Sequence, residues 1–209
     1  SAGFLLRDPH ILSDMEIIRA DALPRSAEDV DFSFEIDRIV VEPFDAVPLR
    51  VEPLSQRHKA YGLDDALFER CDGTDKVLFL ASEAGNLAGY ITASLGWNGC
   101  AMVDDFAVAR SFRRRGLASA LMDRIVDWAR DKGLGAIRLE TQSNNVAACS
   151  FYQRYGFVLG GYDRFLYREL GSDTADEVAL FWYLDTRSRK PGDNRIPNES
   201  SRDEGLCPQ

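Results

Sequence analysis

The sequence predicts an α/β (α+β) domain, because a strand meander is followed by helices that alternate with further strands. Residues 76–109 contain three short apolar runs separated by turn signals at residues 83–86 and 98–99. Apolar residues then recur at helical spacing from Leu117 to Trp128, and Gly133 ends that helix. The remaining elements expected are a strand at 137–141, a helix at 145–155, and strands at 157–167 and 178–184.

The chain has 209 residues, of which 45% are hydrophobic, enough to bury one sizeable core. We expect the folded domain at residues 32–185, beginning with a strand at 32–41. Residues 1–31 read as an N-terminal arm with a helix at 11–20, and residues 186–209 as a flexible tail rich in charge and proline.

Between the first strand and the meander, Pro43, Pro48 and Pro53 interrupt regular structure. A short helix is expected at residues 63–71, because Asp64 and Asp65 suit the positive end of a helix. This region is a candidate for variable substrate binding.

Composition excludes several classes of function. No apolar run approaches the roughly 20 residues that span a bilayer, so we expect a soluble, cytoplasmic protein without a membrane partner. The net charge of -9 argues against nucleic acid and favours an electropositive substrate, although acidity also serves solubility alone. Four separated cysteines and two histidines indicate neither a metal site nor disulfides.

An arginine-rich turn precedes the helix at residue 117. Arg113, Arg114 and Arg115 bring positive charge to a helix start whose backbone N–H groups are unpaired, and Gly116 and Ala118 leave room for a close anion. The turn therefore predicts a phosphate site, the alternative being an ordinary arginine-rich loop before a helix.

Two signatures resemble those of the GNAT superfamily of N-acetyltransferases: Arg113-x-x-Gly116-x-Ala118, and Asn145-x-x-Ala148-x-x-Phe151-Tyr152-x-x-x-Gly156-Phe157. The resemblance implies a mixed sheet flanked by helices and splayed between its fourth and fifth strands, residues 101–109 and 137–141. It also implies acetyl-CoA as cofactor, and such enzymes often form homodimers. The implied cofactor-binding residues are Phe106, Ala107, Val108, Arg113, Arg114, Arg115, Gly116, Leu117, Ala118, Ser119, Asn145, Ala148 and Tyr152.

Acetyl transfer to an amine needs a base, since an alkylamine with a pKa of about 10.4 is almost fully protonated at neutral pH. Asp104 and Asp105 are the candidates, and as neighbours on a strand they should point to opposite faces. We favour Asp104, because similar enzymes carry an acid at this place, the alternative being that either only binds cation or water. The resemblance makes Tyr152 the general acid, although aromatic residues on such helices usually belong to the core.

Residues 137–149 and 156–163 resemble the streptothricin (nourseothricin) acetyltransferases, and the likeness covers roughly residues 75–185. Such enzymes acetylate the β-lysine moiety of a polycationic antibiotic, so the resemblance implies a small cationic amine as partner. Trp97 offers an aromatic face to an ammonium group, unless it only covers the base of its hairpin. Acidic residues suited to lining the cleft are Asp64, Asp65, Asp104, Asp105 and Glu140.

Three alternatives stay open. An aminoglycoside acetyltransferase would need the same acidic cleft, and a protein or peptide N-acetyltransferase would need an open groove. A non-catalytic acyl-CoA sensor would keep the cofactor turn, but Tyr152 and an acid on the fourth strand favour an enzyme.

Overall fold

The computed structural model describes residues 15–171, 174 and 177–187. The chain divides into two compact units: unit 1 comprises Ser1–Glu35 and Arg57–Ile137, and unit 2 comprises Ile36–Gln56 and Arg138–Gln209. The first part of the predicted arm and residues 188–209 of the predicted tail lie outside the described residues, and the domain boundaries stay predictions. No helix in the described ranges is long and apolar enough to cross a membrane.

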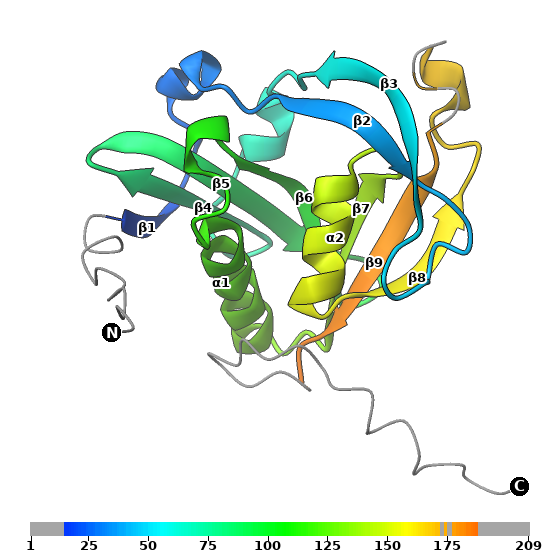
Figure 1. Cartoon of the computed structure of the whole chain (residues 1–209). Coiled ribbons are helices and arrows are strands. Elements are labelled where there is room, and N and C mark those ends of the chain that lie inside the picture. The colour runs from blue at the N-terminus through cyan, green and yellow to red at the C-terminus, as the bar shows by residue number, and fades with distance from the viewer. Residues whose placement is uncertain (1–14, 172–173, 175–176, 188–209) are drawn as a thin grey trace, which may run out of the picture. The chain divides into compact units, whose positions relative to one another are not determined.

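Unit 1 contains an antiparallel sheet with the strand order β1-β4-β5-β6 (Figure 1). Its strands are β1 (Met15–Ala20), β4 (Lys76–Glu83), β5 (Asn86–Leu95) and β6 (Cys100–Val108). Tight turns join β4 to β5 and β5 to β6, with Gly85 and Gly99 at positive φ. The predicted three-strand meander is confirmed.

Strand β1 replaces the second half of the helix predicted at residues 11–20, so that prediction is wrong for residues 15–20. Met15 lies opposite Glu83 and Ala20 opposite Leu78, in a continuous antiparallel register with β4. The main-chain groups at the edge of β4 pair with this segment, and this tertiary pairing outweighs a weak helical propensity.

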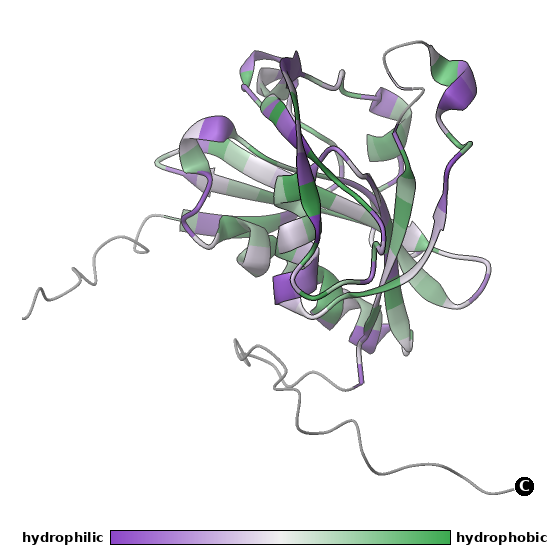
Figure 2. Ribbon diagram, turned by 45° about the vertical axis from the view of Figure 1, so that its right-hand side comes forward, coloured by the Kyte–Doolittle hydropathy of each residue, from purple (hydrophilic) through white to green (hydrophobic). Residues whose placement is uncertain are grey.

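Helix α1 (Leu117–Asp131) contacts β4, β5 and β6. Its apolar positions Leu117, Leu121 and Ile125 are buried, and Leu121 approaches β5 at Gly89. The helix begins and ends as predicted, with Gly133 at a φ of +70° just beyond its last turn. Figure 2 shows hydrophobic residues in many of the strands and helices, interrupted by hydrophilic ones.

The other face of this sheet carries a second cluster of buried residues, Phe68, Cys71, Leu78 and Tyr90. Phe68 ends η3 (Asp65–Phe68), a 3₁₀ turn that is shorter than the helix predicted at residues 63–71. The preceding segment of unit 1 forms another 3₁₀ turn, η2 (Arg25–Asp29).

A separate two-stranded sheet pairs β2 (Phe34–Val40) with β3 (Val51–Lys59). The strand predicted at residues 32–41 is confirmed. Strand β3 was not predicted, because Pro53 suggests a break. Proline lacks only its own N–H, and a strand of a two-stranded ribbon tolerates that loss where the N–H faces outward.

Unit 2 has the strand order β7-β9-β8, formed by β7 (Ala136–Gln142), β8 (Val158–Asp163) and β9 (Ala179–Asp185). Helix α2 (Val146–Tyr155) ends at Gly156, which has a φ of +110° as a helix-ending glycine should. Strand β8 is shorter than the predicted 157–167, since the Asp163 carboxylate accepts a hydrogen bond from the Phe165 N–H and turns the chain. The 3₁₀ turn η5 (Arg168–Leu170) follows.

Candidate active site

The predicted phosphate turn joins β6 to α1 in unit 1, after the 3₁₀ turn η4 (Arg110–Phe112). Gly116 is the N-cap of α1 with a φ of +86°, a conformation that costs other residues energy. No side chain caps the helix, and its first turn carries no acidic residue. The N–H groups of Leu117, Ala118 and Ser119 therefore have no capping side chain, which suits them to an anion.

The three arginines of the turn have different environments. Arg113 donates through Nε to the Val108 carbonyl at 3.0 Å and through a terminal nitrogen to the Phe32 carbonyl at 2.9 Å. Its burial lowers the pKa of the guanidinium. Arg115 pairs with Glu83. Arg114, exposed and at a φ of +60°, makes neither an ion pair nor a side-chain hydrogen bond with another described residue.

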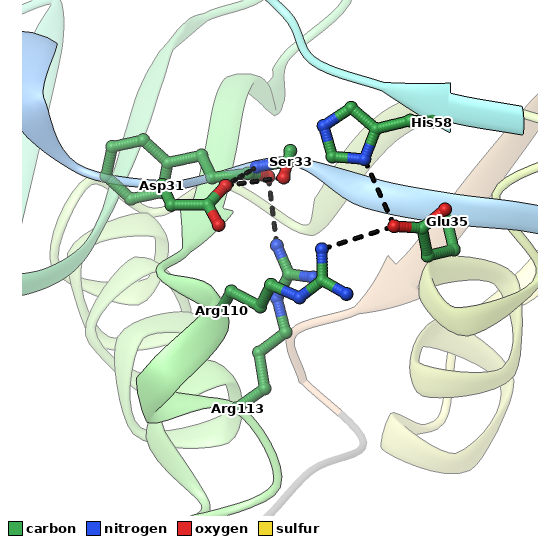
Figure 3. A network of polar contacts seen from close by, with 7 residues as sticks. Asp31, Ser33, Glu35, His58, Arg110 and Arg113 are labelled. Carbon is green, nitrogen blue, oxygen red and sulfur yellow. Dashed lines mark hydrogen bonds and ion pairs between the residues drawn. The ribbon is translucent and has the colours of Figure 1, made fainter.

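A polar network ties the turn to the segment that leads into β2 (Figure 3). The Arg110 main-chain N–H donates to the Asp31 carbonyl at 2.9 Å, and its guanidinium lies 3.3 Å from Glu35. His58 of β3 contacts the same Glu35 oxygen at 3.1 Å. The hydrogen bond from His58 is the main cause of the lowered pKa of Glu35. This network fixes where the turn lies within unit 1.

The main chain at the end of β6 bonds to β5 at alternate residues. The Ala109 N–H donates to the Ala88 carbonyl of β5, and main-chain groups alternate in direction along a strand. The groups of Phe106 and Val108 therefore point away from β5, while Ala107 packs beside Tyr90. The Val108 carbonyl already accepts from Arg113. The predicted cofactor contacts at Phe106 and Val108 stay predictions.

Asp104 and Asp105 lie on the same face of the sheet, so the expectation that they point apart is wrong. The register of β5 and β6 shifts between Thr92 and Ala93, where Asp104 is an extra residue in β6. Asp105 accepts a hydrogen bond from the Tyr90 hydroxyl at 2.9 Å, and Asp104 accepts one from Ser94 at 2.8 Å. Tyr90 and Ser94 share a face of β5, and a β-bulge can turn two neighbouring side chains the same way.

Burial raises the pKa of both carboxyls. After burial, the hydrogen bond from Ser94 and the charge of Lys76 lower the pKa of Asp104, whereas the charge of neighbouring Asp105 raises it further. One oxygen of Asp104, Oδ2, is buried and has no hydrogen-bond partner in the described structure. Asp105 is better satisfied, since Oδ1 also accepts from the Phe106 N–H at 2.7 Å.

Asp64 and Asp65 differ in their surroundings. Asp64 accepts from the Ala66 N–H at the start of η3 and is close enough to Asp105 to raise the pKa of that carboxyl. Asp65 instead lines a shallow hollow of unit 1 with Asp21 and Glu69. Of the acidic residues predicted to line a cleft, unit 1 thus groups Asp64 with Asp104 and Asp105.

Trp97, at the turn between β5 and β6, is 96% exposed. A side chain so exposed does not cover the base of its hairpin, which removes that alternative. Its indole is available to a ligand, but the predicted contact with an ammonium group stays a prediction.

In unit 2, Tyr152 is only 6% exposed and its ring lies among aromatic neighbours. The centroid of the Tyr152 ring lies 5.6 Å from that of Phe157 and 6.2 Å from that of Trp182. Asn145 caps α2 by accepting from the Ala148 N–H at 3.1 Å, as predicted. The ring of Tyr152 thus belongs to the core of unit 2, and the role of its hydroxyl stays a prediction.

Glu140 of β7 is exposed, and its carboxylate accepts a hydrogen bond from Tyr167. The Tyr167 hydroxyl in turn accepts from the Gln142 amide at 3.1 Å. Sequence reasoning identified Glu140 but missed Tyr167, and it also missed Tyr90 and Ser94 beside the aspartates. The only signal for Tyr167 was that a tyrosine hydroxyl in a largely apolar segment needs a polar partner.

Comparisons with known proteins identify the family. The acetyltransferase (GNAT) family matches residues 45–157. Streptothricin acetyltransferase A of Bacillus subtilis is 36% identical over 60% of this chain and 71% of its own length. Streptothricin acetyltransferase of Escherichia coli is 35% identical over 65% of this chain and 74% of its own.

A crystal structure from Bacillus anthracis, of a candidate streptothricin acetyltransferase in complex with acetyl coenzyme A, superposes with a TM-score of 0.68. It is 29% identical and covers 82% of this chain and 98% of its own. The α/β fold implied by the resemblance is therefore confirmed. The chain belongs to the acetyltransferase (GNAT) family and is an N-acetyltransferase that is similar to the streptothricin acetyltransferases.

Proposed function

We propose that this protein transfers an acetyl group from acetyl-CoA to a primary amine of a small cationic acceptor, the β-lysine moiety of streptothricin. The names of its relatives support this acceptor, and the Bacillus anthracis structure with acetyl coenzyme A supports the donor. The observation that carries the proposal is the pair of carboxylates, Asp104 and Asp105, on one face of β6 in a chain whose family transfers acetyl groups.

The residues of the turn fit the pyrophosphate of acetyl-CoA. Helix α1 lacks a capping side chain, whereas Asn145 caps α2, so the N–H groups from Leu117 to Ser119 are left for a ligand. Arg114 is the guanidinium of the turn that neither pairs with a carboxylate nor donates to a main-chain carbonyl of a described residue. Arg113 and Arg115 then act mainly by shaping the turn, through their bonds to main-chain carbonyls and to Glu83.

The acceptor needs a negative environment, and unit 1 supplies one. Asp64, Asp104 and Asp105 lie close enough that charge on one disfavours charge on the next. A cationic amine relieves that repulsion, which favours ammonium groups over neutral ligands. We also assign an acceptor-binding role to Glu140, which is exposed, and a cation–π contact to the exposed Trp97.

Acetyl-CoA, when bound, supplies an acetyl thioester. In the proposed reaction Asp104 removes a proton from the ammonium group of the acceptor, and its raised pKa suits it to this work near neutral pH. The amine nitrogen forms the amide bond as the thioester C–S bond breaks. We assign the proton given to the departing sulfur to the Tyr152 hydroxyl, and the second proton that the acceptor nitrogen loses on forming the amide restores that hydroxyl through solvent. Asp105, held by Tyr90 and its own main chain, maintains the local negative potential.

The test is thiol release from acetyl-CoA with streptothricin, kanamycin and a lysine-terminated peptide as separate acceptors. We expect the highest kcat/KM with streptothricin. Asp104→Asn should lose most of this turnover, about 100-fold or more if it removes the base. Asp127→Asn, an exposed carboxylate on α1, is the matched control and should retain it.

Rapid turnover of kanamycin or the peptide, with none of streptothricin, would assign the enzyme to one of the alternative acceptors. Binding of acetyl-CoA without turnover of any acceptor would instead favour a sensor. A homodimer and a cytoplasmic location remain predictions beside this proposal.

A further inference from the structure

We propose that Tyr167 is a positioning residue for the acceptor: its hydroxyl holds one oxygen of the Glu140 carboxylate, so that the other oxygen can receive an ammonium group. The inference rests on the proposed function, because it takes Glu140 to be an acceptor-binding residue. Nothing in the two family signatures includes Tyr167, which follows β8 in a segment between strands.

The geometry in unit 2 is a three-membered chain of hydrogen bonds. Glu140 and Gln142 are two residues apart on β7, so their side chains leave the same face of the strand. The Tyr167 hydroxyl lies between them, accepting from the Gln142 amide at 3.1 Å and donating to Glu140 Oε1. Since the hydroxyl has one proton and its oxygen accepts from Gln142, the direction of the chain is fixed toward the carboxylate.

Tyr167 is itself held firmly. Only 8% of the residue is exposed. Its main-chain carbonyl accepts from the Leu170 N–H at 3.1 Å and from the Thr174 hydroxyl at 3.0 Å. A ring anchored at both ends has little freedom to leave Glu140, so the carboxylate is oriented before a ligand arrives. Such preorganisation reduces the entropy lost on binding.

The charge of Glu140 is not neutralised by its neighbours. Arg138 lies two residues before it, on the same face of β7, but its guanidinium stacks over the Phe181 ring at 4.8 Å and makes no ion pair within the described ranges. Glu140 Oε2 accepts no hydrogen bond there either. An exposed carboxylate with one oxygen fixed and one open is suited to a cation with several N–H donors, which is the chemistry of an ammonium group.

The test is a double-mutant cycle on the 209-residue chain with streptothricin as acceptor, using Tyr167→Phe, Glu140→Gln and both together. Tyr167→Phe keeps the ring and removes only the hydroxyl. It should raise KM for streptothricin about tenfold, as expected for a lost hydrogen bond to a charged group, and leave KM for acetyl-CoA unchanged. Tyr162→Phe, a tyrosine of β8 that packs on Phe44, is the matched control.

The cycle separates positioning from a general structural effect. If Tyr167 acts through Glu140, adding Tyr167→Phe to Glu140→Gln should raise KM little further. A full additional tenfold increase, an equal loss for acetyl-CoA, or a Tyr167→Phe variant with the KM of the wild type would each overturn the inference.

Failure of the proposed function would show differently. If the wild type does not acetylate streptothricin, the proposed acceptor is wrong, and the same cycle is measured with whichever of kanamycin or the lysine-terminated peptide is acetylated. If Glu140→Gln leaves KM for the acceptor unchanged, Glu140 does not bind the acceptor and the inference about Tyr167 is overturned with it. If Glu140→Gln raises KM for the acceptor but Tyr167→Phe does not, the inference about Tyr167 is overturned while the proposed function stands.

Discussion

The Tyr90 hydroxyl donates a hydrogen bond of 2.9 Å to the Asp105 carboxylate, deep beside the cluster that Tyr90 forms with Phe68. This bond lowers the pKa of Asp105, but burial outweighs it and leaves that pKa above its usual value. Burial is also the main cause of the raised pKa of Asp104, which lies one residue earlier on the same face. The bulge in β6 therefore brings together two acids that both resist ionisation.

The stability of the fold should depend on pH through Asp104 and Asp105. Because the pKa values of Asp104 and Asp105 are higher in the folded chain than in the unfolded chain, the folded state binds more protons above about pH 4. The free energy of unfolding should therefore fall as pH rises from about 4 through the raised pKa values. Asp104→Asn should reduce this fall, measured by urea unfolding across that range, whereas Asp127→Asn should not. If the free energy of unfolding of Asp104→Asn falls with pH as steeply as that of the wild type, the pKa of Asp104 is not raised by folding.

Gly116 is predicted to be needed for the conformation of the cofactor turn. Gly116→Ala should destabilise the fold by about 1–2 kcal/mol, since alanine is strained at positive φ, and should also greatly weaken acetyl-CoA binding measured by calorimetry. Gly85→Ala is the control, because Gly85 has a φ of +79° and equally open space around it. The two variants should lose similar stability, but only Gly116→Ala should lose affinity. Retained affinity in Gly116→Ala would refute the assignment of the turn.

Removal of the Tyr152 hydroxyl should affect turnover more than binding. Tyr152→Phe keeps the ring contacts with Phe157 and Trp182, so kcat should fall about 100-fold, with the Kd for acetyl-CoA little changed. Tyr155→Phe on the same helix should keep kcat near that of the wild type. A loss of acetyl-CoA affinity without a loss of kcat would make Tyr152 a binding residue.

The arginines of the turn should separate by role. Arg114→Ala should weaken acetyl-CoA binding a few-fold, more at low salt than at high salt, because the side chain is exposed and screened. Arg113→Ala should instead destabilise the protein by about 1–3 kcal/mol, since it leaves the Val108 and Phe32 carbonyls without a donor. Thermal unfolding and acetyl-CoA titration of both variants check this. A stable Arg113→Ala that has lost only affinity would contradict it.

Trp97 is predicted to matter for the acceptor but not for folding. An indole that is 96% exposed contributes little to the core, so Trp97→Ala should change stability by less than about 0.5 kcal/mol. If it contacts the acceptor cation, KM for streptothricin should rise about two- to fivefold. An unchanged KM would show that the indole takes no part.

Local patterns predicted the elements around both signatures. Gly116 precedes the first residue of one predicted helix and Gly156 follows the last residue of the other. Both have a positive φ, a conformation that glycine adopts readily at helix ends. The meander from β4 to β6 could be predicted from the sequence because its strands are adjacent in sequence and joined by short turns. Strand β1 was not, since its pairing with β4 depends on residues about sixty positions away.

The details of the candidate site depended on register and on distant contacts. If side chains alternated strictly along β6, Asp104 and Asp105 would lie on opposite faces. The pairing with β5 shows the bulge, because Thr92 lies opposite Asp105 and Ala93 opposite Val103, which leaves Asp104 as an extra residue. Tyr167 reaches Glu140 from 27 positions along the chain, so no local pattern connects them. The residues that tune the site are therefore those that sequence reasoning could not place.

The most direct test of the proposed function is identification of the product by tandem mass spectrometry after streptothricin is incubated with acetyl-CoA and the wild-type protein. We expect one acetyl group on an amine of the β-lysine moiety, formed at the rate of thiol release and about 100-fold more slowly with Asp104→Asn. Unmodified streptothricin under conditions in which another amine is acetylated would contradict it.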